Sequence, residues 1–212
     1  GEVSDVKKVV SPVLVNDKNT TLMHIDFSFD TLKLGGSAFA QSLGKVGSDV
    51  PTVKNPEYFR DAFLAVQDLV KEGLILAGHD ISAGGLITTL LEMTFANQKG
   101  GIEANLNDIA EKDPVKLLFA ENPGVVIQVK DADKKDIAKM LDNAGVGYVE
   151  IGKPIDEREV VVKKDGRTRR FDIDKLRDIW YSTSYRLDTK QSFNGMAKER
   201  YSNYKNQPIE HK

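Results

Sequence analysis

The residue types with the clearest chemical potential lie at positions 78–85, where the sequence reads Gly-His-Asp-Ile-Ser-Ala-Gly-Gly. Asp80 offers a carboxylate, the kind of hard oxygen ligand that Mg²⁺ prefers, and Mg²⁺ usually bridges to phosphate. Ser82 offers a hydroxyl to the same metal or phosphate. Gly84 and Gly85 let a ligand approach the backbone without a Cβ in the way. These residues predict a site for Mg²⁺ and phosphate, with Asp80 as the metal ligand and Ser82, Gly84 and Gly85 as nucleotide contacts.

The flanking sequence predicts how this segment is positioned. Residues 74–77 read as a short buried strand, and Leu86 and Leu90 recur at helical spacing, so the junction is strand, turn, helix. In open α/β sheets the carboxyl ends of strands border the ligand crevice, and a helix N-terminus carries partial positive charge. An alternative reading needs no ligand: Asp80 and Ser82 cap the helix, and the glycines make a tight turn.

Four other features lie near the expected crevice. His79 stands beside a buried strand, where a single histidine is more often structural than catalytic. Glu92 is a candidate outer carboxylate of a metal site, or a solvated residue. The loop 35–37, Gly-Gly-Ser, precedes a short helical segment, and the segment 121–123, Glu-Asn-Pro, is read as a turn that could meet the same crevice. Each of these is weaker evidence than the segment 78–85.

The remaining elements alternate between strands and helices. Asn55 and Pro56 predict the N-terminus of a helix that ends at Gly73, and Asp131 is expected to cap a second helix. Residues 165–166, Asp-Gly, predict a tight hairpin turn. Strands are expected around residue 13 and at 22–27, 124–129, 149–152, 160–162 and 167–171, with a short edge strand from 102. This mixed order predicts an α/β fold, a mixed-sheet sandwich with helices on one or both faces.

The end of the chain has a different character. From residue 174 onward, Leu176, Ile179, Trp180, Thr183 and Leu187 share one helical face, and a polar tail follows. We expect an α/β domain over residues 1–173 and a helical linker or docking segment over 174–212. The aromatic residues of that helix, including Tyr181 and Tyr185, are expected to pack on the core or on a neighbouring domain.

Composition excludes several classes of function. The 212 residues contain no cysteine and three histidines, so disulfides, thiolate metal sites and a polyhistidine zinc site are not expected. A net charge of −2 without a long basic run gives no indication of nucleic-acid or membrane binding. No apolar run is long enough for a membrane helix and no signal sequence opens the chain, so we expect a reducing, cytoplasmic location. Because the sequence starts at Gly1 without methionine, we also expect a piece of a longer protein.

Several motifs together resemble one enzyme family. The segment 78–86, followed by Leu-Glu-Met at 91–93, resembles the HDxSxGGL…EM signature of the ATP-dependent synthetase superfamily of the purine pathway. The segments 34–38, 118–124 and 151–154 resemble its LGGS loop, its LF.E..G segment and its closing IG.V segment. Residues 176–183 are similar to the LR..W..T helix of the large, single-chain phosphoribosylformylglycinamidine synthases. The resemblance covers nearly the whole chain in order.

The resemblance implies a fold, an activity and partners. The fold would be that of the C-terminal domain related to aminoimidazole ribonucleotide synthetase, from the second synthetase half. The complete enzyme would be a glutamine-dependent ligase that uses ATP to convert formylglycinamide ribonucleotide to the amidine. Asp80 would be a Mg²⁺ ligand and Ser82 a nucleotide contact, with Mg²⁺ and ATP or ADP as cofactors. An N-terminal synthetase subdomain and a glutaminase domain would complete the chain, so this piece alone is expected to be inactive.

One residue departs from the family pattern, since Ala83 stands where many members have a second aspartate. That departure removes one candidate metal or hydrogen-bond partner. A kinase-like or selenophosphate-type member of the superfamily is an alternative, as is a module without chemistry that binds a small molecule or dimerises. Whether the adjoining nucleotide site is catalytic or structural stays open at this point.

Overall fold

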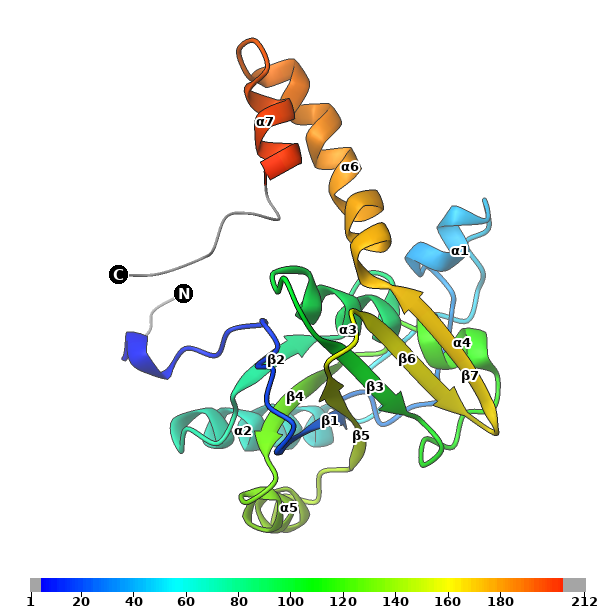
Figure 1. The fold of residues 1–212 in the computed structure, drawn as a ribbon. Coiled ribbons are helices and arrows are strands. Elements are labelled where there is room, and N and C mark those ends of the chain that lie inside the picture. Colours follow the sequence, from blue (N-terminus) through cyan, green and yellow to red (C-terminus); the bar gives the residue numbers. More distant parts are fainter. Residues whose placement is uncertain (1–4, 204–212) are drawn as a thin grey trace.

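The structure is a computed structural model that describes residues 5–203, and its elements build one sheet with helices around it (Figure 1). The strands are β1 (Thr20–Asp26), β2 (Ala77–Asp80), β3 (Gly101–Asn105), β4 (Gly124–Lys130), β5 (Tyr148–Ile155), β6 (Glu159–Lys164) and β7 (Arg167–Asp172). The helices are η1 (Val6–Lys8), α1 (Ala38–Ser42), α2 (Pro56–Lys71), α3 (Gly85–Phe95), α4 (Pro114–Phe119), α5 (Lys134–Asn143), α6 (Ile173–Gln191) and α7 (Met196–Asn203).

The sheet has seven strands in the order β2-β4-β1-β5-β3-β6-β7. Only the β3–β6 pair is parallel, and every other neighbouring pair is antiparallel. β1 and β2 both run antiparallel to β4, and β1 and β3 both run antiparallel to β5. The carboxyl ends of β1, β2 and β3 therefore lie at the same end of the sheet, here called its carboxyl edge. The strand order therefore gathers at that edge the segments that follow these three strands.

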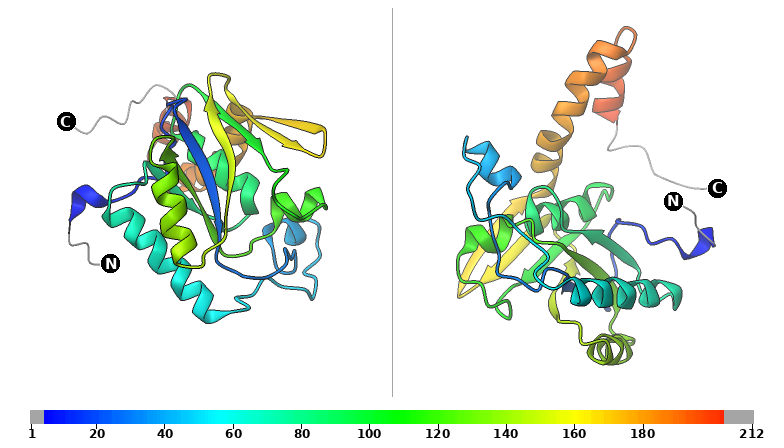
Figure 2. Two further views of the ribbon diagram at one scale, coloured as in Figure 1. Left: turned by 90° about the horizontal axis from the view of Figure 1, so that it is seen from below. Right: turned by 180° about the vertical axis from the view of Figure 1, so that it is seen from behind.

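Helices cover both faces of the sheet, as the two further views also show (Figure 2). One face packs against α2 and α5, whose buried residues include Leu69 and Leu141. The opposite face packs against α3 and α4, whose buried residues include Leu90 and Leu117. Apolar residues alternate between the two faces along β1, where Leu22 and Met23 belong to different clusters. The predicted mixed-sheet α/β sandwich is confirmed.

Three local predictions were wrong. The expected strand at 74–77 lies three residues later, because Ile75 packs under α2 as the chain enters β2. The segment from Ile102 is not an edge strand, since β3 lies between β5 and β6. The run around Val13 forms no strand in the described residues.

The cap predicted at Asp131 was also wrong. The N-cap position of α5 is Asp133, which makes no side-chain cap bond. Asp131 instead accepts hydrogen bonds from Thr21 Oγ1 (2.6 Å) and Lys153 Nζ (2.7 Å). These partners lower the pKa of the Asp131 carboxyl, the bond from Lys153 most. Asp131 therefore joins neighbouring strands at the sheet end.

Other boundaries agree with the sequence. Asn55 caps α2 through bonds from the backbone N–H groups of Glu57 and Tyr58, and Gly73 follows the helix with φ 71°. The β6–β7 hairpin turns at Asp165 and Gly166, both with positive φ, as a type I′ turn requires. The expected hairpin and helix are confirmed.

The C-terminal helices project from this body. Ile173 is buried in the core at the start of α6, and the helix then leads away to α7, which folds back along it (Figure 1). Part of the expected linker, residues 204–212, lies outside the described residues. No helix of the described part is long and apolar enough to cross a bilayer.

A buried amide attaches the N-terminal segment to the sheet. Gln128 is fully buried in β4; its Oε1 accepts from the backbone N–H of Val15 (2.8 Å), and its Nε2 donates to Val15 O and Thr20 Oγ1 (both 2.7 Å). All of its polar atoms are therefore paired within the fold, although the central position of a sheet favours apolar residues.

We expect Gln128→Leu to lower the free energy of unfolding by more than about 2 kcal/mol, since each buried polar group left unpaired costs about 1–3 kcal/mol. Urea unfolding followed by circular dichroism measures the loss. Gln67→Leu on α2, where no side-chain hydrogen bond is formed, is the matched control. Equal stability of the two variants would contradict a fastening role for Gln128.

Candidate functional site

Backbone hydrogen bonds to β4 hold the segment that leads into the turn between β2 and α3. The N–H of Leu76 donates to Gln128 O and the N–H of Ile81 donates to Gly124 O, both at 2.8 Å, so the segment is anchored to β4 before and after the strand. The chain then turns through Ser82, whose carbonyl accepts from the N–H of Gly85 (3.0 Å). The predicted strand, turn and helix are present, and they bring residues 80–85 to the carboxyl edge of the sheet.

The two glycines of the turn adopt conformations that other residues avoid. Gly84 is the N-cap of α3 with φ 90°, and Gly85 has φ 70°. A Cβ on Gly85 would lie 2.7 Å from Leu118 O and 2.8 Å from Ala120 O, so the start of α3 packs directly on the end of α4. The structure therefore gives Gly85 a packing requirement of its own, while Gly84 stays partly exposed at the turn.

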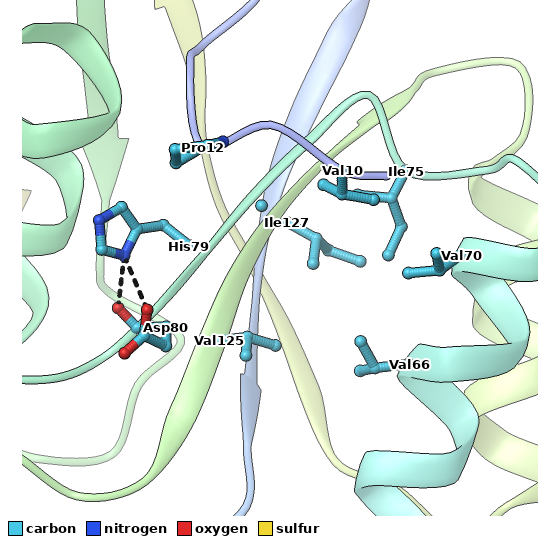
Figure 3. A pocket seen from close by; sticks show the side chains of 10 residues that line it. Val10, Pro12, Val66, Val70, Ile75, His79, Asp80, Val125 and Ile127 are labelled. Atoms are coloured by element: carbon cyan, nitrogen blue, oxygen red, sulfur yellow. Dashed lines mark hydrogen bonds and ion pairs between the residues drawn. The ribbon is translucent and has the colours of Figure 1, made fainter. Parts of the chain in front are cut away.

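Asp80 and Ser82 do not cap the helix. Among the described residues neither side chain accepts a hydrogen bond from a backbone N–H of α3, the N–H of the N-cap Gly84 is bonded to Glu121, and both side chains are exposed. Asp80 Oδ1 lies 3.3 Å from His79 Nδ1, and the Asp80 carboxylate is 71% exposed (Figure 3). The capping alternative is therefore wrong, and the carboxylate and hydroxyl stay available on the outer side of the turn.

Glu121 is the residue at this site whose structural role the sequence analysis underrated. Its Oε1 accepts from the backbone N–H of Gly84 (2.8 Å) and from that of Ala38 (2.7 Å). One carboxylate oxygen thus joins the N-terminus of α3 to the first residue of α1. The neighbouring Asn122 is buried and bonds to Lys33 N, Ser28 Oγ and Thr31 O. The segment read as a simple turn therefore connects three loops at this edge.

The Gly-Gly-Ser loop lies beside the same turn through Glu121. A Cβ on Gly35 would lie 2.5 Å from Asp49 O, so this glycine permits a close backbone crossing. Ser37 caps α1 by accepting from the N–H of Ala40 (3.2 Å). Phe39 of α1 stacks on Phe119 of α4 with ring centroids 4.7 Å apart. The structure therefore brings together two of the segments that the sequence had singled out separately.

A chain of polar contacts runs from this turn to α6. Trp180 Nε1 donates to Glu92 Oε1 (2.8 Å), Glu92 Oε2 lies 3.1 Å from His79 Nε2, and His79 Nδ1 lies 2.8 Å from Asp80 O. The Trp180 ring also packs on Phe95 with centroids 5.4 Å apart. His79 and Glu92 are therefore positioning residues between the Asp80 turn and the projecting helix.

An apolar hollow of about 380 Å³ adjoins the turn on the α2 side of the sheet (Figure 3). Val66 and Val70 of α2 face Val125 and Ile127 of β4 across it, and His79 and Asp80 lie at one end. The polar turn thus borders an apolar surface.

The residues of the turn could supply one of the ligands of a metal ion, but not a complete site. Among residues 5–203 no group of three or more His, Cys, Asp or Glu side chains is arranged to hold a metal ion. Mg²⁺ is commonly bound by one or two carboxylates together with phosphate oxygens and water, so one exposed aspartate fits such a share.

These features define a mixed-sheet α/β domain with a glycine-rich, polar turn at the carboxyl edge of its strands. Residues 26–165 match the family model described as "AIR synthase related protein, C-terminal domain". The chain belongs to this family, and the resemblance inferred from its motifs is confirmed.

Two curated relatives carry the name of a particular enzyme within this family. The chain is 36% identical over 190 residues to a protein of Arabidopsis thaliana named "Probable phosphoribosylformylglycinamidine synthase, chloroplastic/mitochondrial", a match that covers 88% of this chain and 13% of that protein. It is 33% identical over 193 residues to the phosphoribosylformylglycinamidine synthase of Homo sapiens, covering 89% of this chain and 14% of that protein. The chain thus spans about one seventh of the length of these relatives.

Solved structures share the fold. PurL of Thermotoga maritima, complexed with ATP, superposes with a TM-score of 0.62 at 15% identity, covering 81% of this chain and 28% of that chain. The hydrogenase maturation protein HypE, in complex with ATP, superposes with a TM-score of 0.53 at 16% identity, covering 78% of this chain and 53% of that chain. At such identities the likeness shows the fold alone.

The close contact at Gly85 predicts a large effect of one methyl group. Gly85→Ala combines left-handed strain of about 1–2 kcal/mol with overpacking of about 1–3 kcal/mol against α4. Gly145→Ala is the control, since Gly145 has a similar φ of 67° and no atom within 4 Å of the added Cβ. Denaturant unfolding should show the greater loss for Gly85→Ala, and equal losses would contradict the packing account.

The contact chain to α6 predicts a spectroscopic change. Trp180 is the single tryptophan of the sequence, so its fluorescence reports on this one place. Glu92→Ala removes the acceptor of the indole N–H of the half-exposed Trp180, and we expect a red-shifted emission and a loss of about 0.5–1.5 kcal/mol of stability. Glu72→Ala, at the exposed end of α2, should leave the emission unchanged. An unshifted spectrum in Glu92→Ala would show that Glu92 does not hold Trp180.

Proposed function

We propose that this chain is the nucleotide-site domain of a phosphoribosylformylglycinamidine synthase, from the second synthetase half. The complete enzyme is a ligase of de novo purine biosynthesis that converts formylglycinamide ribonucleotide, glutamine and ATP to formylglycinamidine ribonucleotide. The names of the curated relatives and the family model support this proposal. Since the chain spans 13–14% of those relatives, the activity belongs to the longer protein.

One observation carries the site assignment. Asp80 and Ser82 are exposed at the carboxyl edge of the sheet, beside a helix N-terminus that already attracts an anionic oxygen from Glu121. Backbone N–H groups at such a terminus favour negative charge. We assign Asp80 as a Mg²⁺ ligand and Ser82 as a phosphate contact. When Mg²⁺-nucleotide is bound, this domain would hold part of its charged phosphate group, through Ser82 and the Mg²⁺ ion at Asp80.

The glycines take different parts in the proposal. Gly84 lies at the partly exposed turn, where its N–H is taken by Glu121 and the place of its missing Cβ is occupied by Thr88. Gly85 contributes indirectly, because the end of α4 covers its Cα. Its lack of a side chain lets the N-terminus of α3 pack in the position that the proposed site requires. Nucleotide phosphate would therefore reach Ser82 and the Asp80-bound metal first.

The chain is expected to be inactive alone. Without a cysteine in its 212 residues it cannot supply the thiol nucleophile of a glutaminase. The single carboxylate of the turn leaves room for ligands from an N-terminal synthetase subdomain. We infer that this subdomain and a glutaminase domain are the partners of the described domain, and that the complete enzyme works in the cytoplasm.

Asp80→Asn tests the site assignment in the full-length enzyme. Loss of the carboxylate charge should weaken Mg²⁺-ADP affinity about tenfold or more, the factor for 1.4 kcal/mol. Asp156→Asn is the control, because Asp156 is an exposed carboxylate that follows β5 at the opposite edge of the sheet. Isothermal titration calorimetry measures both affinities.

An unchanged Mg²⁺-ADP affinity in Asp80→Asn would contradict the assignment of Asp80 as a Mg²⁺ ligand. It would favour the second candidate, a module that binds a small molecule or dimerises without chemistry. The apolar hollow between α2 and β2 is the feature that such a module would use.

A further inference from the structure

A second hollow, of about 830 Å³, lies on the α3 and α4 side of the same sheet edge. Its floor includes His24 of β1 and Val149 of β5, and its walls include Leu86 of α3 and Leu117 of α4. The loops 29–32 and 108–112 form its mouth. Small-molecule sites commonly have volumes of about 300–1,000 Å³ and largely apolar walls with few polar groups. Neither Asp80 nor Ser82 lines this hollow.

The polar group at the floor is without a partner in the fold. Burial lowers the pKa of His24, more strongly than the neighbouring Asp26 raises it, so the imidazole is neutral near pH 7. Neither ring nitrogen forms a hydrogen bond with any residue between 5 and 203. A neutral imidazole has one donor and one acceptor, and His24 is only partly buried, so its ring nitrogens can bond to a molecule in the hollow.

Gly124 helps to keep one nitrogen open. It lies on the neighbouring strand β4 opposite Asp26, two positions along from the partner of His24, and a Cβ built there would lie 3.2 Å from His24 Nε2. The absence of a side chain at this position leaves that nitrogen uncovered on the β4 side.

The mouth of the hollow presents a constrained aromatic ring. Phe29 is 55% exposed and has φ 51°, a conformation that residues other than glycine rarely adopt. Asp26 imposes it, since Oδ2 accepts from Phe29 N (2.9 Å) while Oδ1 accepts from Ser28 N and Ser28 Oγ. The ring leans on Tyr58 with centroids 4.8 Å apart. Strained residues held in this way cluster at ligand-binding places.

The charges around the mouth give no preference for a charged ligand. Lys54 and Lys112 oppose Asp108 and Glu111. The carboxylate of Asp26 already accepts bonds from Ser28 and Phe29 through both oxygens. Asp30 is already engaged by Lys33 Nζ (2.6 Å) and Thr52 Oγ1 (2.9 Å). The free interactions that remain are the two nitrogens of His24 and the face of Phe29.

We propose that this hollow is a second small-molecule site that takes an uncharged aromatic nitrogen heterocycle, bonded to His24 at the floor and stacked on Phe29 at the mouth. Such a ligand carries a donor and an acceptor that complement a neutral imidazole, and an aromatic face for Phe29. The hollow adjoins the Asp80 turn through Ile81, but its proposed ligand contacts, His24 and Phe29, are separate from Asp80 and Ser82.

Nuclear magnetic resonance of the 212-residue chain tests this proposal with adenine, cytosine and imidazole-4-carboxamide as probes. The sequence has three histidines, at 24, 79 and 211, so the ring signal of His24 is assigned by its loss in His24→Phe. We expect at least one probe at millimolar concentration to shift the His24 signal, with or without Mg²⁺. No shift with any of the three probes would overturn the proposal.

Three variants distinguish this site from the other. His24→Phe keeps a ring but removes both nitrogens, so it should weaken probe binding, followed here by the signals of the probe itself, about tenfold, the contribution of roughly one hydrogen bond. Ala110→Trp closes the mouth from an exposed position and should abolish binding without disturbing the core. Asp80→Asn should leave probe binding unchanged. Binding lost in Asp80→Asn, or retained in both His24→Phe and Ala110→Trp, would contradict the second site.

Discussion

The functional edge of this domain depends on one carboxylate. Glu121 Oε1 accepts backbone N–H groups from the N-cap of α3 and from the first residue of α1, and thereby joins the glycine-rich turn to the Gly-Gly-Ser loop. The buried Asn122 beside it holds the loop 28–33. A charged acceptor shared by two backbone donors is a strong interaction in a partly buried place. Without it, the segments that follow β1 and β2 and the segment that precedes β4 would lose their common anchor.

This arrangement explains how a domain with one exposed aspartate can serve a larger site. The turn offers Asp80 and Ser82 outward, while His79 and Glu92 connect its inner side to Trp180 on the projecting helix. Movement of α6 would therefore act on the turn through direct contacts. Such a connection suits the proposed place of this domain between neighbours in a longer enzyme.

Much of this could be predicted from the sequence, because the signals were local. The helix start at Asn55, the turn at Asp165 and the glycine-rich helix rest on capping, turn and periodicity rules that need only neighbouring residues. The interior place of β3 and the role of Asp131 depend on partners more than 20 residues away, which no local pattern shows. Glu121 read as part of a turn for the same reason, since its partners are Ala38 and Gly84. His24 gave no signal at all, because its importance comes from the hollow around it.

The central claim is that this domain holds part of a Mg²⁺-nucleotide site that a neighbouring subdomain completes. Calorimetric titration of Mg²⁺-ADP into this chain, beside the same chain extended N-terminally through the preceding synthetase subdomain, tests it most directly. The account predicts saturable binding by the extended protein and none, or far weaker binding, by the chain alone. Absence of binding to the extended protein, or equal affinity in both, would contradict it.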